Sequence, residues 1–317
     1  MTKNTIRRWS SPEMILVATN LLDGPALMLH AVSQAKLTGA KVLLVHVIRP
    51  AYLRADSEYG LPFVLPGPAI RTAWAMLDEL TSQFQQEGVL CEPMVLKGLP
   101  QEQIPLLVKS RQVDRVLVAT RHPRGVERLL ERSVAEELIA ILDVPVCMIG
   151  RHADSHALSK RSPGQVLVAT SLKPGSAHYV RFAFAFAEFH NAHLTLLHVL
   201  DTEGVNEVQR QQARILAEQK LSATVAGEAP LWCKPVLSIR EGDTAYRILD
   251  EASAMPPGFI ILGAPTPSHV IRLLDVSIVH RVVTDARCPV ITLKPLASIE
   301  EQREHESFHF EIGSAAR

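Results

Sequence analysis

The sequence predicts an α/β protein made of two tandem, doubly wound, open parallel sheets with five strands each. The first observation is an internal repeat of three short segments in the same order: 15–19 (ILVAT) at 166–170 (VLVAT), 42–47 (VLLVHV) at 194–199 (LTLLHV), and 143–146 (DVPV) at 287–290 (RCPV). Because the offsets of 151, 152 and 144 residues are nearly equal, the chain contains two copies of one domain.

The second observation is a set of short apolar runs that predict the strands. They are 14–19, 42–48, 93–97, 115–120 and 144–149 in the first copy, and 165–170, 193–199, 234–239, 258–263 and 289–294 in the second. The runs are nearly continuous rather than alternating, which is typical of parallel strands covered on both faces.

The third observation is helical periodicity between the strands. Met28, Ala31, Val32 and Ala35 follow the spacing of one helix face, and the second copy repeats this spacing at 180–187. Strands that alternate with helices predict right-handed βαβ units and hence a doubly wound sheet in each copy.

Length and charge limit the organisation. The 317 residues suit two domains, each long enough to bury a core: 1–151 and 164–297, with a linker at 152–163 and a charged tail at 298–317. Lys and Arg together equal Asp and Glu at 33 each, so no net charge favours nucleic acid, and 5% aromatic residues argue against a base-stacking surface.

The chain is expected to be cytoplasmic. It shows no secretory signal and no apolar run of about 18 residues, so no transmembrane segment is predicted, although this leaves peripheral membrane association open. The four cysteines form no CxxC pair, which favours buried, reduced thiols.

Two segments allow alternative interpretations. The proline-rich stretch 49–72, before a helix expected to begin near Ile70, is either a surface excursion or a lid over a ligand. The tail 298–317 is either frayed or a short helix that docks Phe308 and Phe310.

Ligands of open α/β sheets bind beyond the carboxyl ends of the strands, where the strand order reverses. The first strands are followed by Thr19 and Asn20 in one copy and by Thr170 and Ser171 in the other. The fourth strands are followed by 119–125 (ATRHPRG) and 263–268 (GAPTPS), and each loop continues through an Arg-Leu-Leu triplet to a serine, Ser133 or Ser277, that is expected to open the last helix.

With these features the chain resembles the tandem universal stress proteins over nearly its whole length, apart from linker and tail. The signature of that family is G-x-x-G, nine residues, then G-S/T after the fourth strand, and nucleotide-binding members place an aspartate after the first strand. The resemblance implies an adenine-nucleotide α-hydrolase-like fold, ATP as a possible ligand and a role in stress response. It also implies an intramolecular pseudo-twofold pair through the last strands, 145–149 and 289–293.

The nucleotide signature is eroded in this sequence. Its glycine positions fall on Ala119, His122 and Arg132 before Ser133 in the first copy, and on Gly263, Thr266 and Val276 before Ser277 in the second. Asn20 and Ser171 replace the aspartate. Side chains at these positions add bulk where glycines let backbone N–H groups approach phosphates.

The resemblance nevertheless assigns a candidate ligand site to each copy. The candidate residues are Ala18, Thr19, Asn20, Val47, Ala119, Arg121, His122, Arg132, Ser133 and Val134 in the first copy, and Ala169, Thr170, Ser171, Val199, Gly263, Thr266 and Ser277 in the second.

Charge separates the two sites. The first copy carries an arginine cluster that would form an anion site or, as the simpler interpretation, a solvated loop paired with nearby glutamates: Arg121, Arg124, Arg128 and Arg132 beside Glu127 and Glu131. The second copy has Pro265, Pro267 and Asp275 instead, which does not favour phosphate.

Several motif residues have structural explanations. Ser133 begins a capping box, 133–136 (SVAE), and Ser277 is expected to be a helix N-cap. His46 and His198 close the second strands, where a neutral, hydrogen-bonded imidazole is a better interpretation than a catalytic base. A His-x-x-His pair at 190–193 lacks a third ligand, so no zinc site is expected.

Three functions follow from these observations. The favoured one is a non-catalytic stress protein that binds a small ligand or a protein partner and has degenerate nucleotide sites. The alternative is an ATP-binding, slowly hydrolysing protein that uses the first copy through Thr19, Val47, Arg121 and Ser133. A transferase ranks last, because no paired acid, base and nucleophile is found, and P-loop, dinucleotide and α/β-hydrolase motifs are absent from the sequence.

Overall fold

The computed structural model describes residues 3–23, 25–49, 67–120, 134–153, 164–173, 175–228, 234–264 and 272–294. The first copy contains α1 (Lys3–Ser10), β1 (Met14–Ala18), α2 (Pro25–Thr38), β2 (Lys41–Ile48), α3 (Gly67–Gln86), β3 (Cys91–Lys97), α4 (Pro100–Ser110), β4 (Arg115–Ala119), α5 (Val134–Ile141) and β5 (Val146–Ile149). The second contains β6 (Gln165–Ala169), α6 (Ala177–Phe189), β7 (His193–Leu200), α7 (Glu207–Glu228), β8 (Val236–Glu241), α8 (Thr244–Ala254), β9 (Phe259–Gly263), α9 (Arg272–Asp285) and β10 (Val290–Leu293).

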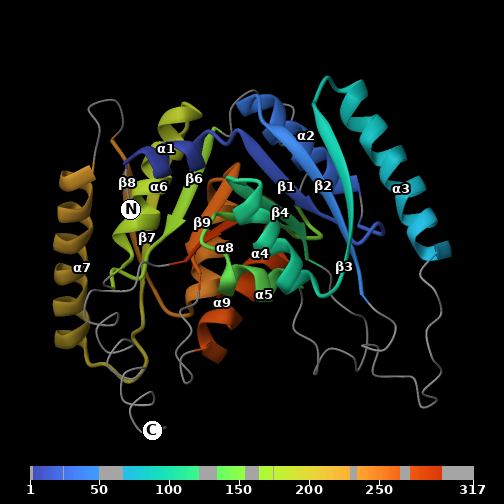
Figure 1. The fold of residues 1–317 in the computed structure, drawn as a ribbon. Coiled ribbons are helices and arrows are strands. Elements are labelled where there is room, and N and C mark those ends of the chain that lie inside the picture. Colours follow the sequence, from blue (N-terminus) through green and yellow to red (C-terminus); the bar gives the residue numbers. More distant parts are fainter. Residues whose placement is uncertain are drawn as a thin grey trace, which may run out of the picture.

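The ten strands of the described segments form one sheet in the order β3-β2-β1-β4-β5-β10-β9-β6-β7-β8. Among the described residues, the strand pairs within each copy are parallel, and the pair that joins the copies, β5 with β10, is antiparallel. The predicted five-stranded, doubly wound parallel sheet is therefore confirmed for each copy. Figure 1 shows the two halves side by side, with β3 and β8 at the outer ends of the shared sheet.

The contact between β5 and β10 has pseudo-twofold symmetry. Cys147 pairs with Ile291, which is the equivalent residue of the second copy at the 144-residue offset. Another equivalent pair, Glu136 of α5 and His280 of α9, also meets across this axis, with 2.6 Å between Oε1 and Nδ1. These are the strands for which the family resemblance implies pairing inside one chain.

Both hydrophobic cores cross from one copy to the other. Because side chains along a strand alternate between faces, Ile15 and Val17 join one cluster while Leu16 and Ala18 join the other. Helices α1, α2, α3, α6 and α7 supply the first cluster, and α4, α5, α8 and α9 the second. Each copy does bury a core, but the cores merge because the sheet is continuous through β5 and β10.

The predicted helix face and helix start can be compared with the structure. Met28, Ala31 and Ala35 are buried, and Val32 is partly buried against the same cluster, so the periodicity is confirmed. Helix α3 begins at Gly67 rather than near Ile70, because a proline in a first turn needs no N–H donor. Residues 67–72 are therefore helical, whereas 50–66 and the tail 298–317 lie outside the described residues.

Helix α1 is an element that the sequence did not predict. It precedes β1 in the chain, yet it packs against α6 of the second copy (Figure 1). Trp9 is buried in the shared core, and its ring lies edge-on to His178 at 6.1 Å. The helix was not predicted because Lys3, Arg7 and Arg8 make the segment polar and it contains few apolar residues. Within the described ranges, no helix has the length and apolar composition required to cross a bilayer.

Candidate functional site

The candidate residues at the strand ends of each copy lie at the carboxyl edge of the sheet. In the first copy, β1 lies between β2 and β4, so Ala18, Thr19, Val47 and Ala119 are brought to one edge. Thr19 continues the strand pattern by donating its N–H to the Val45 carbonyl at 2.9 Å. The second copy arranges its counterparts in the same way on β6, β7 and β9: Ala169, Thr170, Val199 and Gly263.

Five candidates lie outside the described residues: Arg121, His122, Arg132, Ser133 and Thr266. Val134 is the first residue of α5. Ser277 lies inside α9, which begins at Arg272, so the predicted N-cap role of Ser277 is wrong. The residues before this serine, RLLDV, include no glycine or proline, and the helix therefore extends through them.

The loop after β1 closes on itself. The Thr19 hydroxyl accepts the Leu21 N–H at 3.0 Å and donates to the Asp23 carboxylate at 3.1 Å. The same Asp23 oxygen accepts the Asn20 N–H at 3.0 Å, and the Asn20 side-chain oxygen accepts the Leu22 N–H at 2.9 Å. Asn20, which stands where nucleotide-binding members have aspartate, thus stabilises its own turn.

The loop after β6 has the same turn, but a different residue takes the place of Asp23. Thr170 accepts the Leu172 N–H at 3.2 Å, and Ser171 accepts the Lys173 N–H at 3.4 Å. In place of a carboxylate, the Tyr179 hydroxyl of α6 accepts the Ser171 N–H at 3.2 Å and donates to Thr170 at 3.4 Å. Both loops turn through a leucine with positive φ, 69° at Leu21 and 55° at Leu172.

Tyr179 also explains the surviving signature glycine of the second copy. A Cβ at Gly263 would lie 2.7 Å from Cε1 of Tyr179, which is closer than real Cβ contacts allow. Tyr179 is itself buried. In the first copy the equivalent positions hold Leu27, which is smaller than Tyr179, and Ala119, which is larger than Gly263. The space that glycine leaves in the second copy is therefore filled by the chain's own aromatic ring.

The contacts that Tyr179 and Asp23 make with these loops were not predicted from the sequence. A joint comparison of the two copies offers a signal for Tyr179, because Leu27 with Ala119 in one copy becomes Tyr179 with Gly263 in the other. Asp23 offers no such signal, because its role depends on the conformation of its loop.

The repeated histidines hold these loops in place. Nδ1 of His46 lies 2.9 Å from the Thr19 carbonyl oxygen, and Nδ1 of His198 lies 2.8 Å from that of Thr170. A carbonyl oxygen only accepts, so Nδ1 is the donor in both contacts. The prediction of a hydrogen-bonded structural imidazole is confirmed at both positions.

The other sequence candidates for chemistry are explained by the fold. His190 is the C-cap residue of α6, and His193 is the first residue of β7. Across the described segments, no cluster of three His, Cys, Asp or Glu residues is arranged to hold a metal. Burial raises the pKa of Cys147 to about 11 and that of Cys288 to about 12, which makes both free thiols poor nucleophiles at neutral pH.

Comparison with known proteins identifies relatives of both halves. The model of the universal stress protein family matches residues 13–150 and 164–294. A universal stress protein of Methanocaldococcus jannaschii is 26% identical over 132 residues, which cover 38% of this chain and 71% of that protein.

Two solved structures are similar over both halves. A universal stress protein from Archaeoglobus fulgidus superposes with a TM-score of 0.66 and 18% identity, covering 89% of this chain and 96% of that one. A functionally unknown protein from Pseudomonas aeruginosa gives a TM-score of 0.60 and 16% identity, with coverage of 91% and 95%. At these identities the likeness concerns the fold.

Proposed function

This chain belongs to the universal stress protein family, and from that premise we propose that it is a non-catalytic member that binds a small ligand or a protein partner through diverged, degenerate nucleotide sites. The observation that carries the proposal is the position of Tyr179. Its ring fills the space beside Gly263, and its hydroxyl accepts the Ser171 N–H. The signature glycine of the second copy therefore makes room for the chain's own tyrosine.

The first copy supports the same proposal by its charge. The Asp23 carboxylate lies at the end of β1 and accepts both the Thr19 hydroxyl and the Asn20 N–H. A carboxylate repels phosphate, and the N–H that it binds is no longer available to an anion. The edge of the first copy therefore favours a neutral or cationic group over a polyphosphate.

Free thiols support a location in the cytoplasm. Cys91, Cys147 and Cys288 are free, and two of them are buried. Unpaired cysteines of this kind are typical of reducing compartments.

Isothermal titration of the purified chain with Mg-ATP tests the proposal. We expect no binding in the micromolar range, and native mass spectrometry of the same preparation is expected to show no co-purified ATP. Micromolar binding with a stoichiometry of one or two would contradict the proposed degeneration of the sites.

A second candidate function is ATP binding by the first copy alone. It is favoured by the absence of a tyrosine at Leu27, the counterpart of Tyr179, and by the four arginines of the 119–133 sequence: Arg121, Arg124, Arg128 and Arg132. In this case Mg-ATP should raise the melting temperature of the wild-type chain.

A pair of variants separates the two candidates. Leu27→Tyr combined with Ala119→Gly transfers the tyrosine–glycine pair into the first copy and should abolish any shift caused by Mg-ATP. Tyr179→Leu is the matched change in the second copy and should leave that shift unaltered. A wild-type shift that neither variant changes would contradict a site at the edge of the first copy.

A further inference from the structure

The two copies differ where they meet on the face of the sheet covered by α1, α2 and α6. Equivalent buried positions carry polar side chains or a thiol in the first copy and apolar ones, three of them aromatic, in the second: His30 and Phe182, Gln34 and Phe186, Arg115 and Phe259, Cys147 and Ile291. Because equivalent residues of the two copies meet across the pseudo-twofold axis, the polar surface of the first copy lies against the aromatic surface of the second.

Arg115, the first residue of β4, is the centre of the polar surface. It is fully buried, with its guanidinium donating to Gln34 Oε1 at 2.9 Å and to the Trp9 carbonyl at 2.6 Å. The guanidinium carbon lies 5.3 Å from the centre of the Phe186 ring, which belongs to the second copy. A cation over an aromatic face is favourable, and more so when both groups are desolvated.

The guanidinium remains charged in this environment. Burial lowers the pKa of Arg115 to about 10, while Cys147 and Asp114 act in the opposite direction. Asp114 itself is bound by Arg8 and by the N–H groups of Glu13 and Met14. Within the described part of the chain, Nε of Arg115 has no hydrogen-bond partner, so the aromatic ring is a main part of the cation's surroundings.

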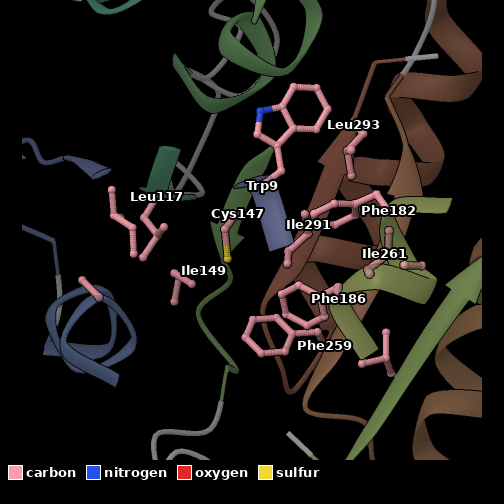
Figure 2. Close-up of a cluster of buried hydrophobic side chains, with 14 of the residues drawn as sticks. Trp9, Leu117, Cys147, Ile149, Phe182, Phe186, Phe259, Ile261, Ile291 and Leu293 are labelled. Carbon is pink, nitrogen blue, oxygen red and sulfur yellow. The ribbon is translucent and has the colours of Figure 1, made fainter. Parts of the chain in front are cut away.

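The aromatic surface extends beyond one ring. Phe186 lies edge-on to Phe259 at 5.1 Å and 5.6 Å from Phe182, and Figure 2 shows these rings beside Ile291 and Cys147 at the junction of the copies. Phe259 occupies the position equivalent to Arg115. The second copy therefore offers a ring at the position of contact and places no charge of its own opposite Arg115.

Pairing of the first copy with a second copy of itself would lose this match. Under the same symmetry, Arg115 would face the partner's glutamine at position 34 in place of Phe186, and two guanidinium groups would share one buried region. Uncompensated buried charges carry a large desolvation cost. Two second copies would meet through aromatic rings without a buried charge.

We propose that Arg115 and Gln34 of the first half and Phe186 and Phe259 of the second half form a pairing code, by which the first half pairs with the second and is prevented from pairing with a copy of itself. Helix α1 completes the code, since the Trp9 carbonyl satisfies the cation while the Trp9 ring packs against α6 of the second half.

The test uses the full chain with a specific protease site inserted in the sequence 154–163. Isotope-labelled and unlabelled preparations are cut, mixed, unfolded in urea and refolded by dilution, and native mass spectrometry counts the pairs. We expect labels to exchange and mixed first-half–second-half pairs to exceed first-half–first-half pairs at least about tenfold, the factor that corresponds to 1.4 kcal/mol. Statistical proportions, or halves that refold as monomers, would overturn the proposal.

Variants in the same cut chain identify the residue responsible. Arg115→Met removes the cation with little change in volume and should raise first-half–first-half pairs roughly tenfold, while Arg115→Lys retains a buried charge and should still exclude them. Arg111→Met removes an exposed arginine that pairs with Glu92 and serves as the matched control with the wild-type distribution. If Arg115→Met left the distribution of pairs unchanged, the proposal would also be overturned, because the cation would then not be what prevents first-half–first-half pairing.

Discussion

The first strands of the two copies, ILVA at 15–18 and VLVA at 166–169, are nearly identical, whereas the helices that follow them present different side chains at the junction. His30 and Gln34 of α2 correspond to Phe182 and Phe186 of α6. Apolar, β-branched strands are sufficient to build either sheet. In the proposed pairing, a few buried side chains of α2, α6, β4 and β9 therefore determine how the two sheets combine, whereas the first strands are nearly the same in both copies.

The loops at the carboxyl edge of the sheet also differ in a single partner. Both loops share a threonine-centred turn and a histidine that holds the threonine carbonyl. The remaining partner is the Asp23 carboxylate in the first copy and the Tyr179 phenol in the second. The two loops therefore share one backbone geometry but differ in charge. The first copy places a carboxylate beside the loop, and the second places a neutral phenol whose ring packs against Gly263.

Removal of the aromatic partner should have the largest effect on stability. Phe186→Ala leaves a cavity in the shared core and exposes Arg115 to an uncompensated environment, so we expect a loss of about 4 kcal/mol in the free energy of unfolding. Phe189→Ala, on the same helix but 44% exposed, should cost less than about 1 kcal/mol. Urea unfolding measures both, and equal losses would contradict the special role of the junction.

Removal of the cation should come next. Arg115→Ala deprives Gln34 and the Trp9 carbonyl of a donor and leaves a cavity, with an expected loss of about 3 kcal/mol. Arg111→Ala breaks a surface ion pair with Glu92 and is expected to cost less than about 1 kcal/mol. If Arg115→Ala proves as mild as its control in urea unfolding, the buried cation does not stabilise the pair.

Acid should weaken the second copy through two buried histidines. Burial, aided by Arg115, lowers the pKa of His190 from 6.5 to about 3, and burial lowers that of His178 to about 4. The folded chain therefore binds fewer protons than the unfolded chain below pH 6.5, and stability is lost as pH falls through this window, by up to about 1.4 kcal/mol per pH unit for each histidine.

A histidine variant locates this pH dependence. In urea unfolding at pH 7, 6 and 5, His190→Gln should flatten the decline by about one proton's slope, whereas His193→Gln, at an exposed position, should not. The first copy has Thr38 and Ala26 at the equivalent positions, which do not titrate. Parallel pH profiles for wild type and His190→Gln would contradict the assignment.

A smaller effect is expected where Tyr179 packs against Gly263 in the second copy. Gly263→Ala forces the Tyr179 ring to move and should cost about 1.5 kcal/mol. Adding Tyr179→Leu recreates the Leu27–Ala119 combination of the first copy and should recover part of that loss. Gly67→Ala is the control, because a Cβ there would meet only the Arg71 Nη1 atom, at an ordinary contact distance of 3.7 Å. A double variant that loses the sum of its single changes in thermal unfolding would argue against the contact.

The two copies, their doubly wound parallel sheets and the buried helix faces could be predicted from the sequence, because repeated segments and local periodicity indicate them. Strand ends differ from the predicted ones by one or two residues, for example β1 ending at Ala18 and β5 beginning at Val146. The predicted N-cap at Ser277 is wrong because the residues before it, RLLDV, form the first turns of α9, although the family motif places a serine at the start of this helix.

The contacts that distinguish the copies could not be predicted because they join distant residues. Arg115 meets Phe186 only after β5 and β10 have paired, and α1 reaches α6 across the junction. Charged strand residues are usually exposed, so a buried arginine is not expected from its sequence context. Likewise, Asp23 became a site residue only through the left-handed turn at Leu21.

In the proposed pairing, the two halves recognise each other through the cation of the first and the aromatic ring of the second. A double-mutant cycle with Arg115→Met and Phe186→Leu in the full chain measures this contact directly by urea unfolding. We predict a coupling free energy of about 1 kcal/mol, against none in a control cycle that pairs Arg111→Met with Phe186→Leu. Additive losses in both cycles, within about 0.3 kcal/mol, would contradict the account.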